Sequence, residues 1–185
     1  MKRQILFIHS AGPQEAGEGS SGLVDCLLNV LGDEYNIHHP LMPEPENPRY
    51  EAWKLKLGQE LSSLKGKVIL IGHSLGASVI LKFLSEEKYS NTISGLFLIS
   101  TPYWKKKNWE IDEYVLKKDF AEKLTGLSHL FLYHSKEDEW VPFSHTQFYA
   151  KKLPNAVVRE LEGQEHEFSY GLPQLIDDIR QPDLN

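Results

Sequence analysis

A change of hydrophobic period near the middle of the chain constrains the fold more than any other feature. Val68 to Ile71 form an unbroken apolar run, which is typical of a strand buried on both faces of a parallel sheet. From Leu75 onward the apolar residues recur at helical spacing, at Val79, Ile80, Phe83 and Leu84. A buried strand that passes within a few residues into an amphipathic helix indicates an α/β protein.

The junction reads Gly72-His73-Ser74-Leu75-Gly76, a G-x-S-x-G pentapeptide. So tight a turn forces Ser74 into a strained backbone conformation and presses positions 72 and 76 against the flanking elements, where only glycine fits. The hydroxyl is thereby lifted above the carboxyl end of the sheet, beside the free peptide N–H groups of the helix N-terminus. Ser74 is the predicted nucleophile; the simpler alternative is a helix N-cap serine.

Apolar strands alternate with helix-patterned segments along the rest of the chain. This alternation predicts a three-layer α/β/α sandwich, a single domain over residues 1–185 with a mostly parallel, six-stranded sheet. The expected strands are 4–9, 35–39, 67–72, 94–100, 129–134 and 156–161. The expected helices are 20–32, 50–63, 75–88, 112–124, 143–152 and 172–180.

The pentapeptide in its strand–turn–helix setting resembles the nucleophile elbow of the α/β-hydrolase superfamily. That resemblance implies an acid and a histidine later in the chain, in the order Ser, acid, His. The stretch from Met42 to Trp53, with its Met-Pro-x-Pro and Trp, is similar to small capless serine hydrolases of the retinoblastoma-binding-protein-9 type. Between Ser100 and His129 there is room for one helix only, so no substantial cap is expected.

Three carboxylates stand side by side after the strand at 129–134, at Glu137, Asp138 and Glu139. A carboxylate is needed there to hold a histidine in one tautomer and to stabilise its charged form. The Asp-x-x-Val-Pro sequence from Asp138 resembles the acid loop of the family. Asp138 is therefore the predicted acid, and the two glutamates are expected to be solvated flanks.

The predicted base is His166, on the loop after the last strand. A histidine there can reach over the top of the sheet to both Ser74 and Asp138, and Gly163 permits the sharp exit from the strand. The family has a Gly-x-His loop at this place, whereas two residues separate glycine from histidine here. His134 and His145 are weaker candidates, because one precedes the acid and the other lies in an expected helix.

The loop after the first strand is expected to supply half of an oxyanion hole. In the family one backbone N–H comes from this loop, and alignment favours Ala11 as the donor with Ser10 as a competitor; the second N–H should come from Leu75. An orienting or packing role is expected for His9. Residues that could bind substrate are Ser10, His73, Tyr103, Trp104 and Trp140, with Trp109 as a further pocket wall.

No cofactor or metal is implied. The sequence from Gly17 to Gly22 matches G-x-G-x-x-G, but it lies too far from the preceding strand to bind a dinucleotide, and Ser20 or Ser21 as a helix cap explains it better. His38 and His39 are adjacent on a strand and so point to opposite faces, which disfavours a metal site.

Composition limits the partners. The net charge of -6 argues against nucleic acid. Cys26 is the only cysteine, so no intrachain disulfide can form, and no apolar run is long enough for a membrane span or a signal-peptide core. A cytoplasmic protein without membrane attachment is expected, and its oligomeric state stays open.

These features together predict a serine hydrolase that cleaves a small ester or thioester through an acyl-enzyme on Ser74. His166 would act as general base and Asp138 would orient it. A peptidase or amidase with the same triad is an alternative, as is a non-catalytic binding module on the same scaffold.

Overall fold

A computed structural model describes residues 2–105, 108–109 and 111–181, and it contains one six-stranded sheet. The strand order is β2-β1-β3-β4-β5-β6, and every neighbouring pair is parallel. The strands are β1 (Arg3–Ile8), β2 (Tyr35–His38), β3 (Lys67–His73), β4 (Thr92–Ile99), β5 (Leu130–Ser135) and β6 (Val157–Leu161). The expected six strands and parallel arrangement are confirmed.

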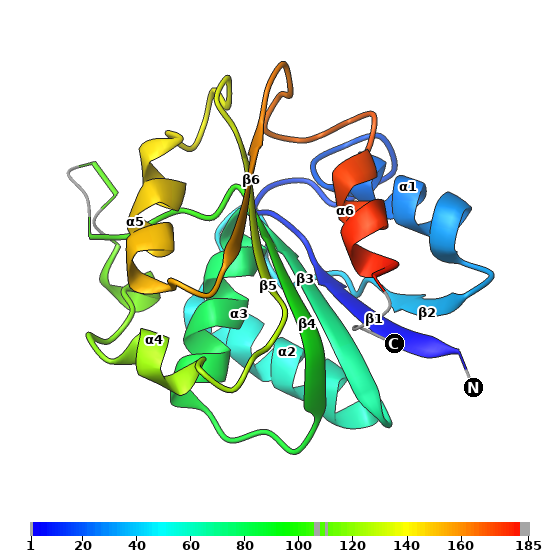
Figure 1. Cartoon of the computed structure of the whole chain (residues 1–185), viewed down its shortest axis with the longest axis horizontal. Helices are drawn as coiled ribbons and strands as arrows, with labels where there is room; N and C mark the ends of the chain where they lie inside the picture. Colours follow the sequence, from blue (N-terminus) through cyan, green and yellow to red (C-terminus); the bar gives the residue numbers. More distant parts are fainter. Residues whose placement is uncertain (1, 106–107, 110, 182–185) are drawn as a thin grey trace.

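Helices cover both faces of the sheet, as Figure 1 shows. Alternate strand residues feed two separate cores, because successive side chains point to opposite faces. Leu70 and Leu98 pack toward α2, α3 and the segments after β4, whereas Ile71 and Phe97 pack toward α1 and α6. The helices are α1 (Ser21–Leu31), α2 (Tyr50–Ser63), α3 (Leu75–Glu86), α4 (Phe120–Lys123), α5 (Ser144–Lys152) and α6 (Pro173–Ile179).

The expected helix at 112–124 is wrong. The structure has a short 3₁₀ turn, η1 (Asp112–Tyr114), followed by extended backbone at Val115 and the single turn α4. Two contacts with distant segments explain the break. The Tyr114 hydroxyl donates to the carbonyl of Pro48, and Lys82 on α3 donates to the carbonyl of Val115, which is thus held outside any helix. No substantial cap is formed by the described residues between β4 and β5.

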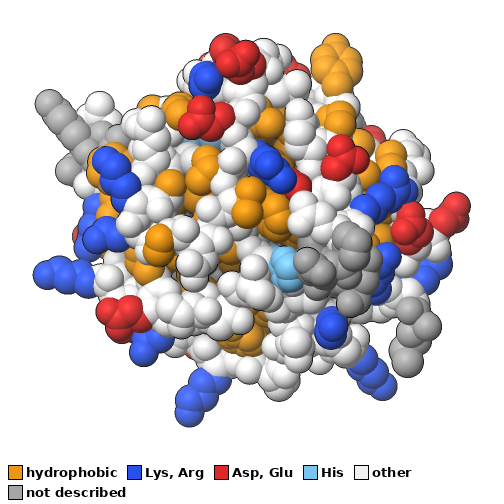
Figure 2. Space-filling model, in the orientation of Figure 1, with side chains coloured by type: hydrophobic (Ala, Val, Ile, Leu, Met, Phe, Trp, Pro, Cys, Tyr) orange, Lys and Arg blue, Asp and Glu red, His pale blue; other side chains and the backbone are white. Residues whose placement is uncertain are grey.

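Charged side chains of both signs are spread over the face in Figure 2, with hydrophobic side chains in small groups between them. This is the ordinary surface of a globular protein. Within the described ranges, no helix has both the length and the apolar character needed to cross a bilayer.

Candidate active site

The turn between β3 and α3 has the strain that its glycines suggest. Ser74 has φ 51° and ψ −117°, and its N–H donates to the carbonyl of Ile99 at 2.8 Å. A Cβ at Gly76 would lie 2.3 Å from the carbonyl oxygen of Ile8, and one at Gly72 would lie 2.6 Å from the Cα of Ala77. Neither position can accept a larger residue without moving backbone, so β1, β3 and α3 fix the place of Ser74.

The carboxyl edge of the sheet carries a cavity of about 680 Å³. Its lining includes Ser74 and Leu75 from the elbow, Ser10 and Ala11 from the loop after β1, and His166 from the loop after β6. Residues far apart in the sequence meet here because the carboxyl ends of parallel strands share one edge. The predicted nucleophile, base and oxyanion donors therefore share one cavity.

His166 and Asp138 form a close pair. Nδ1 of His166 lies 2.9 Å from each carboxylate oxygen of Asp138, whose side chain is fully buried, while His166 is 7% exposed. A carboxylate at Nδ1 places the ring proton there and leaves Nε2 as the proton acceptor. Hydroxyl deprotonation by Nε2 is the chemistry that this arrangement supports.

The carboxylate of Asp138 is held in its charged form. Burial raises its pKa, but hydrogen bonds from His134 and His166, with the charge that His166 can carry, outweigh burial and lower the pKa well below its usual value. Backbone N–H groups of Trp140 and Val141 also donate to Oδ1, at 3.0 and 2.8 Å. Asp138 therefore keeps a negative charge beside Nδ1 of His166.

A second histidine supports the acid. His134 is fully buried at the end of β5, with Nε2 2.7 Å from the carbonyl oxygen of Val141 and 3.3 Å from Oδ2 of Asp138. Only a protonated Nε2 can donate to these oxygens, and in the neutral ring Nδ1 then accepts from the Thr146 hydroxyl, at 2.6 Å. The sequence analysis considered His134 only as a weaker candidate for the base; its place directly before the acid loop was the signal for this supporting contact.

The two neighbouring glutamates are exposed, but they are more than solvated flanks. Glu137 accepts a hydrogen bond from the backbone N–H of Gly163 at 2.8 Å, and Glu139 accepts one from that of His166 at 3.1 Å. The acid loop therefore binds both the ring and the backbone of the histidine loop. These contacts link β5 and β6 at positions that the sequence pattern alone does not reveal.

The oxyanion donors differ in availability. The N–H of Ser10 is already engaged with the Ser20 hydroxyl at 2.9 Å, whereas the N–H of Leu75 lies in the first turn of α3 and has no intrahelical acceptor. Ser20 makes no cap hydrogen bond to α1, so the expected capping role is wrong for this residue. Its hydroxyl instead enters the interior toward His73.

Aromatic side chains wall the cavity, but only some of those expected. Trp104, Trp109 and Trp140 line it, as does Tyr114, which sequence reasoning missed. The Trp104 indole donates to the Ser78 hydroxyl and the Tyr114 hydroxyl donates to the carbonyl of Pro48, so the polar groups of both rings have hydrogen-bond partners in the protein.

Tyr103 and His73 do not line this cavity. Tyr103 stacks on Phe148 and borders a smaller cavity between the segment after β4 and α5. His73 is fully buried behind the elbow. His73, the last residue of β3, points into the core, and Tyr103 turns to Phe148 instead.

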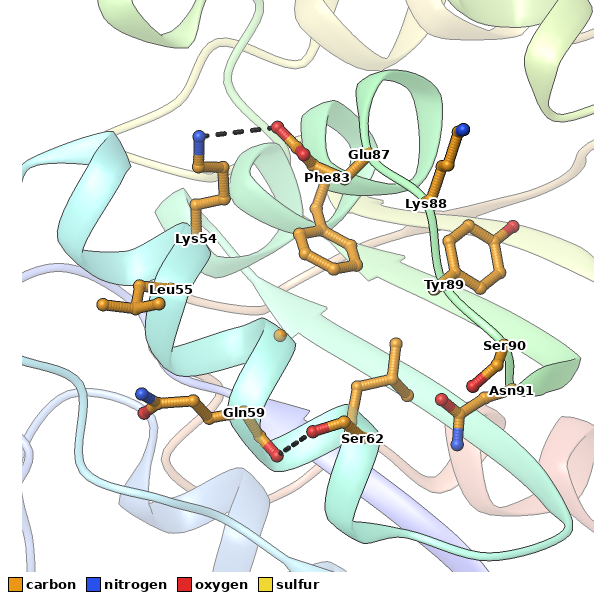
Figure 3. A pocket seen from close by; sticks show the side chains of 12 residues that line it. Lys54, Leu55, Gln59, Ser62, Phe83, Glu87, Lys88, Tyr89, Ser90 and Asn91 are labelled. Atoms are coloured by element: carbon orange, nitrogen blue, oxygen red, sulfur yellow. Dashed lines mark hydrogen bonds and ion pairs between the residues drawn. The ribbon is translucent and has the colours of Figure 1, made fainter.

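Another cavity, of about 670 Å³, lies between α2 and the segment that follows α3 (Figure 3). Lys54 and Glu87 form an ion pair at 3.4 Å beside the apolar rings of Phe83 and Tyr89. It is at the opposite end of α3 from Ser74, roughly 18 Å away for a helix of this length. The three predicted catalytic side chains are absent from its lining.

Comparison with known proteins gives the family. A family model described as serine hydrolase matches residues 31–167, which span the elbow, the acid loop and the histidine. The chain belongs to the serine hydrolase family. Its fold places it in the α/β-hydrolase superfamily.

Similar proteins agree with this assignment. The putative hydrolase YdeN of Bacillus subtilis is 28% identical over 88% of this chain and 85% of its own length. The crystal structure of that ydeN gene product has a TM-score of 0.79, with 95% of this chain and 96% of that one covered at 26% identity. A carboxylesterase structure from Nitrososphaera gargenis has a TM-score of 0.70 at 15% identity, covering 96% and 88% of the chains, a likeness of fold alone.

Another buried histidine, His9, lies outside the His166–Asp138 pair, and its burial predicts that stability depends on pH. Burial lowers the pKa of His9 to about 4, only partly offset by the nearby backbone of His39. The unfolded chain, with an ordinary histidine pKa of 6.5, therefore binds more protons between pH 6.5 and 4. The free energy of unfolding should fall through this window as pH is lowered, by about 3 kcal/mol from His9 alone.

Urea unfolding of the wild type and His9→Phe at pH 7, 5 and 4 measures the contribution of His9 to the free energy of unfolding. The phenyl ring suits the site, because His9 packs edge-on against Phe7 and neither nitrogen makes a hydrogen bond of ordinary geometry to a described residue. The variant should lose about 3 kcal/mol less stability between pH 7 and 4. Equal losses in the two proteins would show that His9 is already protonated, or is solvated, in the folded state.

The described residues hold no group of three or more His, Cys, Asp and Glu side chains suited to bind a metal ion. His38 on β2 pairs with a neighbouring strand instead: its Nε2 lies 3.0 Å from the side-chain oxygen of Gln4 on β1.

Proposed function

We propose that this serine hydrolase cleaves a small carboxylic ester or thioester through an acyl-enzyme on Ser74. The observation that carries the proposal is the buried His166–Asp138 pair at the cavity that also contains the strained elbow. Asp138 fixes the tautomer of His166, so that Nε2 takes the hydroxyl proton as Ser74 attacks the carbonyl carbon. His166 then returns this proton to the leaving alcohol or thiol.

The negative charge that develops on the carbonyl oxygen needs donors. We assign these to the N–H groups of Leu75 and Ala11, and the engagement of the Ser10 N–H with Ser20 supports Ala11 over Ser10. One such donor contributes about 3–4 kcal/mol to transition-state stabilisation in other enzymes. Water, activated by His166 as general base, then attacks the acyl-enzyme and releases the acid.

The cavity favours a neutral substrate of moderate size. Its walls are the aromatic faces described above, and the carboxylates of Glu46 and Glu167 lie at its lining. Among the described lining residues, Arg49 is the one Lys or Arg, and it is paired with Glu113 at 3.2 Å. An anionic acyl group would meet uncompensated negative charge, whereas a neutral acyl group can pack on the tryptophans.

Labelling with a fluorophosphonate probe, followed by hydrolysis of p-nitrophenyl esters of increasing chain length, tests the proposal. The wild type should be labelled at Ser74 and should turn over neutral esters faster than ones with a terminal carboxylate. Anilides of the same acids test for amidase activity, because an amidase would hydrolyse them as well as the esters. A chain that resists the probe and hydrolyses neither series would be a binding module rather than an enzyme.

A further inference from the structure

A chain of hydrogen bonds runs through the interior from the loop after β1 to the loop of His166. The Ser20 hydroxyl lies 3.0 Å from that of Ser10 and accepts the N–H of Ser10 at 2.9 Å. The same Ser20 oxygen lies 2.8 Å from Nδ1 of His73, and Nε2 of His73 lies 2.8 Å from the carbonyl oxygen of His166. All four residues are buried, with exposed fractions from 0 to 7%.

The proton positions in this series of hydrogen bonds follow from its last acceptor, the carbonyl oxygen of His166. A carbonyl oxygen only accepts, so Nε2 of His73 carries the proton and donates to His166. Nδ1 is then an acceptor, and the Ser20 hydroxyl donates to it. The Ser10 hydroxyl in turn donates to Ser20, so every bond points from the oxyanion loop toward the histidine loop.

We propose that His73 is a positioning residue that couples the oxyanion loop to the His166 loop through Ser20. It would hold the carbonyl of His166 while Glu139 holds the N–H and Asp138 holds the ring. The His166 backbone is then clamped on both sides of its Cα, and the ring direction is fixed relative to Ser74. This role presupposes the proposed function.

Packing alone does not account for a histidine at this place. An apolar ring of similar shape would fill the same space, near Phe168 at 6.0 Å and the His166 ring at 4.9 Å between centroids, without the cost of burying two polar atoms. Burial and the adjacent His166 lower the pKa of His73 well below its ordinary value, which keeps the ring neutral, and the carbonyl of His166 places its one proton on Nε2. Both nitrogens are used, and each reaches a different catalytic loop.

Three substitutions at His73 separate its two bonds. His73→Phe removes both, His73→Gln places an amide N–H near the position of Nε2, and His73→Asn places an amide near that of Nδ1. Since misplacement by about 1 Å can cost about 10²-fold, His73→Phe should lower kcat by about 10- to 100-fold with KM changed less than threefold. His73→Gln should recover to within about fivefold of the wild type, whereas His73→Asn should not.

Ser20→Ala is the companion variant. It leaves the bond from His73 to His166 but removes the partner of both Ser10 and Nδ1. We expect a smaller loss of kcat, about three- to tenfold, and slower labelling by the fluorophosphonate probe. Ser21→Ala is the matched control, because Ser21 is the next serine and is only half-buried, in the first turn of α1; it should behave as the wild type.

Amide hydrogen–deuterium exchange tests the coupling without any substrate. In His73→Phe, and in Ser20→Ala, exchange should rise in both residues 10–13 and residues 164–168 relative to Ser21→Ala. A wild type that the probe does not label, but whose variants show this paired rise, would refute the proposed function and retain the coupling. A labelled wild type with unchanged kcat in His73→Phe, or with Gln no better than Asn, would overturn the role of His73.

Discussion

Ser74→Ala is expected to lower kcat for ester hydrolysis by about 10⁴-fold or more. The substitution removes the attacking oxygen, while the N–H groups of Leu75 and Ala11 and the His166–Asp138 pair stay in place. Any remaining turnover would come from water attacking a bound and polarised ester. KM should change little, because the hydroxyl contributes to the reacting bond and little to the walls of the cavity.

The comparison is informative because the fold should be unaffected. Alanine at position 74 meets the same backbone strain as serine, since both carry a Cβ at φ 51°. Ser63→Ala is the matched control, because its exposed hydroxyl donates to the carbonyl of Glu60 within α2, far from the cavity. Residual activity above a tenth of the wild-type value, with the thermal midpoint unchanged, would place the nucleophile elsewhere.

The strands and the elbow could be predicted from sequence because they depend on local constraints. A buried parallel strand must be apolar on both faces, and the turn after β3 can be made only where Gly72 and Gly76 allow backbone contact. The carboxyl ends of parallel strands share one edge of the sheet, so the loops after β5 and β6 begin on the same edge as Ser74, although neither strand is next to β3. Asp138 and His166 were predicted from these loops together with the resemblance to the acid and histidine loops of the family.

The predictions that were wrong concern features that depend on contacts between distant segments. Helical spacing at 112–124 is overridden by the Tyr114 and Lys82 bonds, which no local pattern records. Ser20 at a helix start looks like a cap, yet its hydroxyl is claimed by His73, a residue 53 positions away. Side-chain direction at such sites is set by tertiary structure, so sequence pattern misses it.

The cavity walls illustrate the same limit. Trp104 and Trp140 were expected there, and both line it, because each lies just beyond a strand end. Tyr103 differs by one residue from Trp104 and turns instead to Phe148. In an irregular segment there is no period from which to read the direction of a side chain, and neighbouring aromatics cannot be told apart.

Substitution of the predicted acid, Asp138, should cause the second large loss of activity. Asp138→Asn should lower kcat by about 10⁴-fold, as in serine hydrolases whose triad acid becomes an amide. Its Oδ1 can still accept from the N–H groups of Trp140 and Val141, so these two backbone bonds of the loop are kept, while the acceptor for His134 at Oδ2 is lost. The amide N–H₂, however, faces Nδ1 of His166 and favours the tautomer with the proton on Nε2, which cannot then accept a proton from Ser74.

Glu137→Gln and Glu139→Gln are matched controls, made by the same acid-to-amide change on either side of Asp138. Each glutamine retains an oxygen that can accept the N–H of Gly163 or His166, so we expect kcat within about fivefold of the wild type and a small change in thermal midpoint. Steady-state kinetics and thermal unfolding of the three variants decide the assignment. If either glutamate variant loses more activity than Asp138→Asn, the acid is that glutamate, and the 2.9 Å contacts of Asp138 with His166 serve structure instead of catalysis.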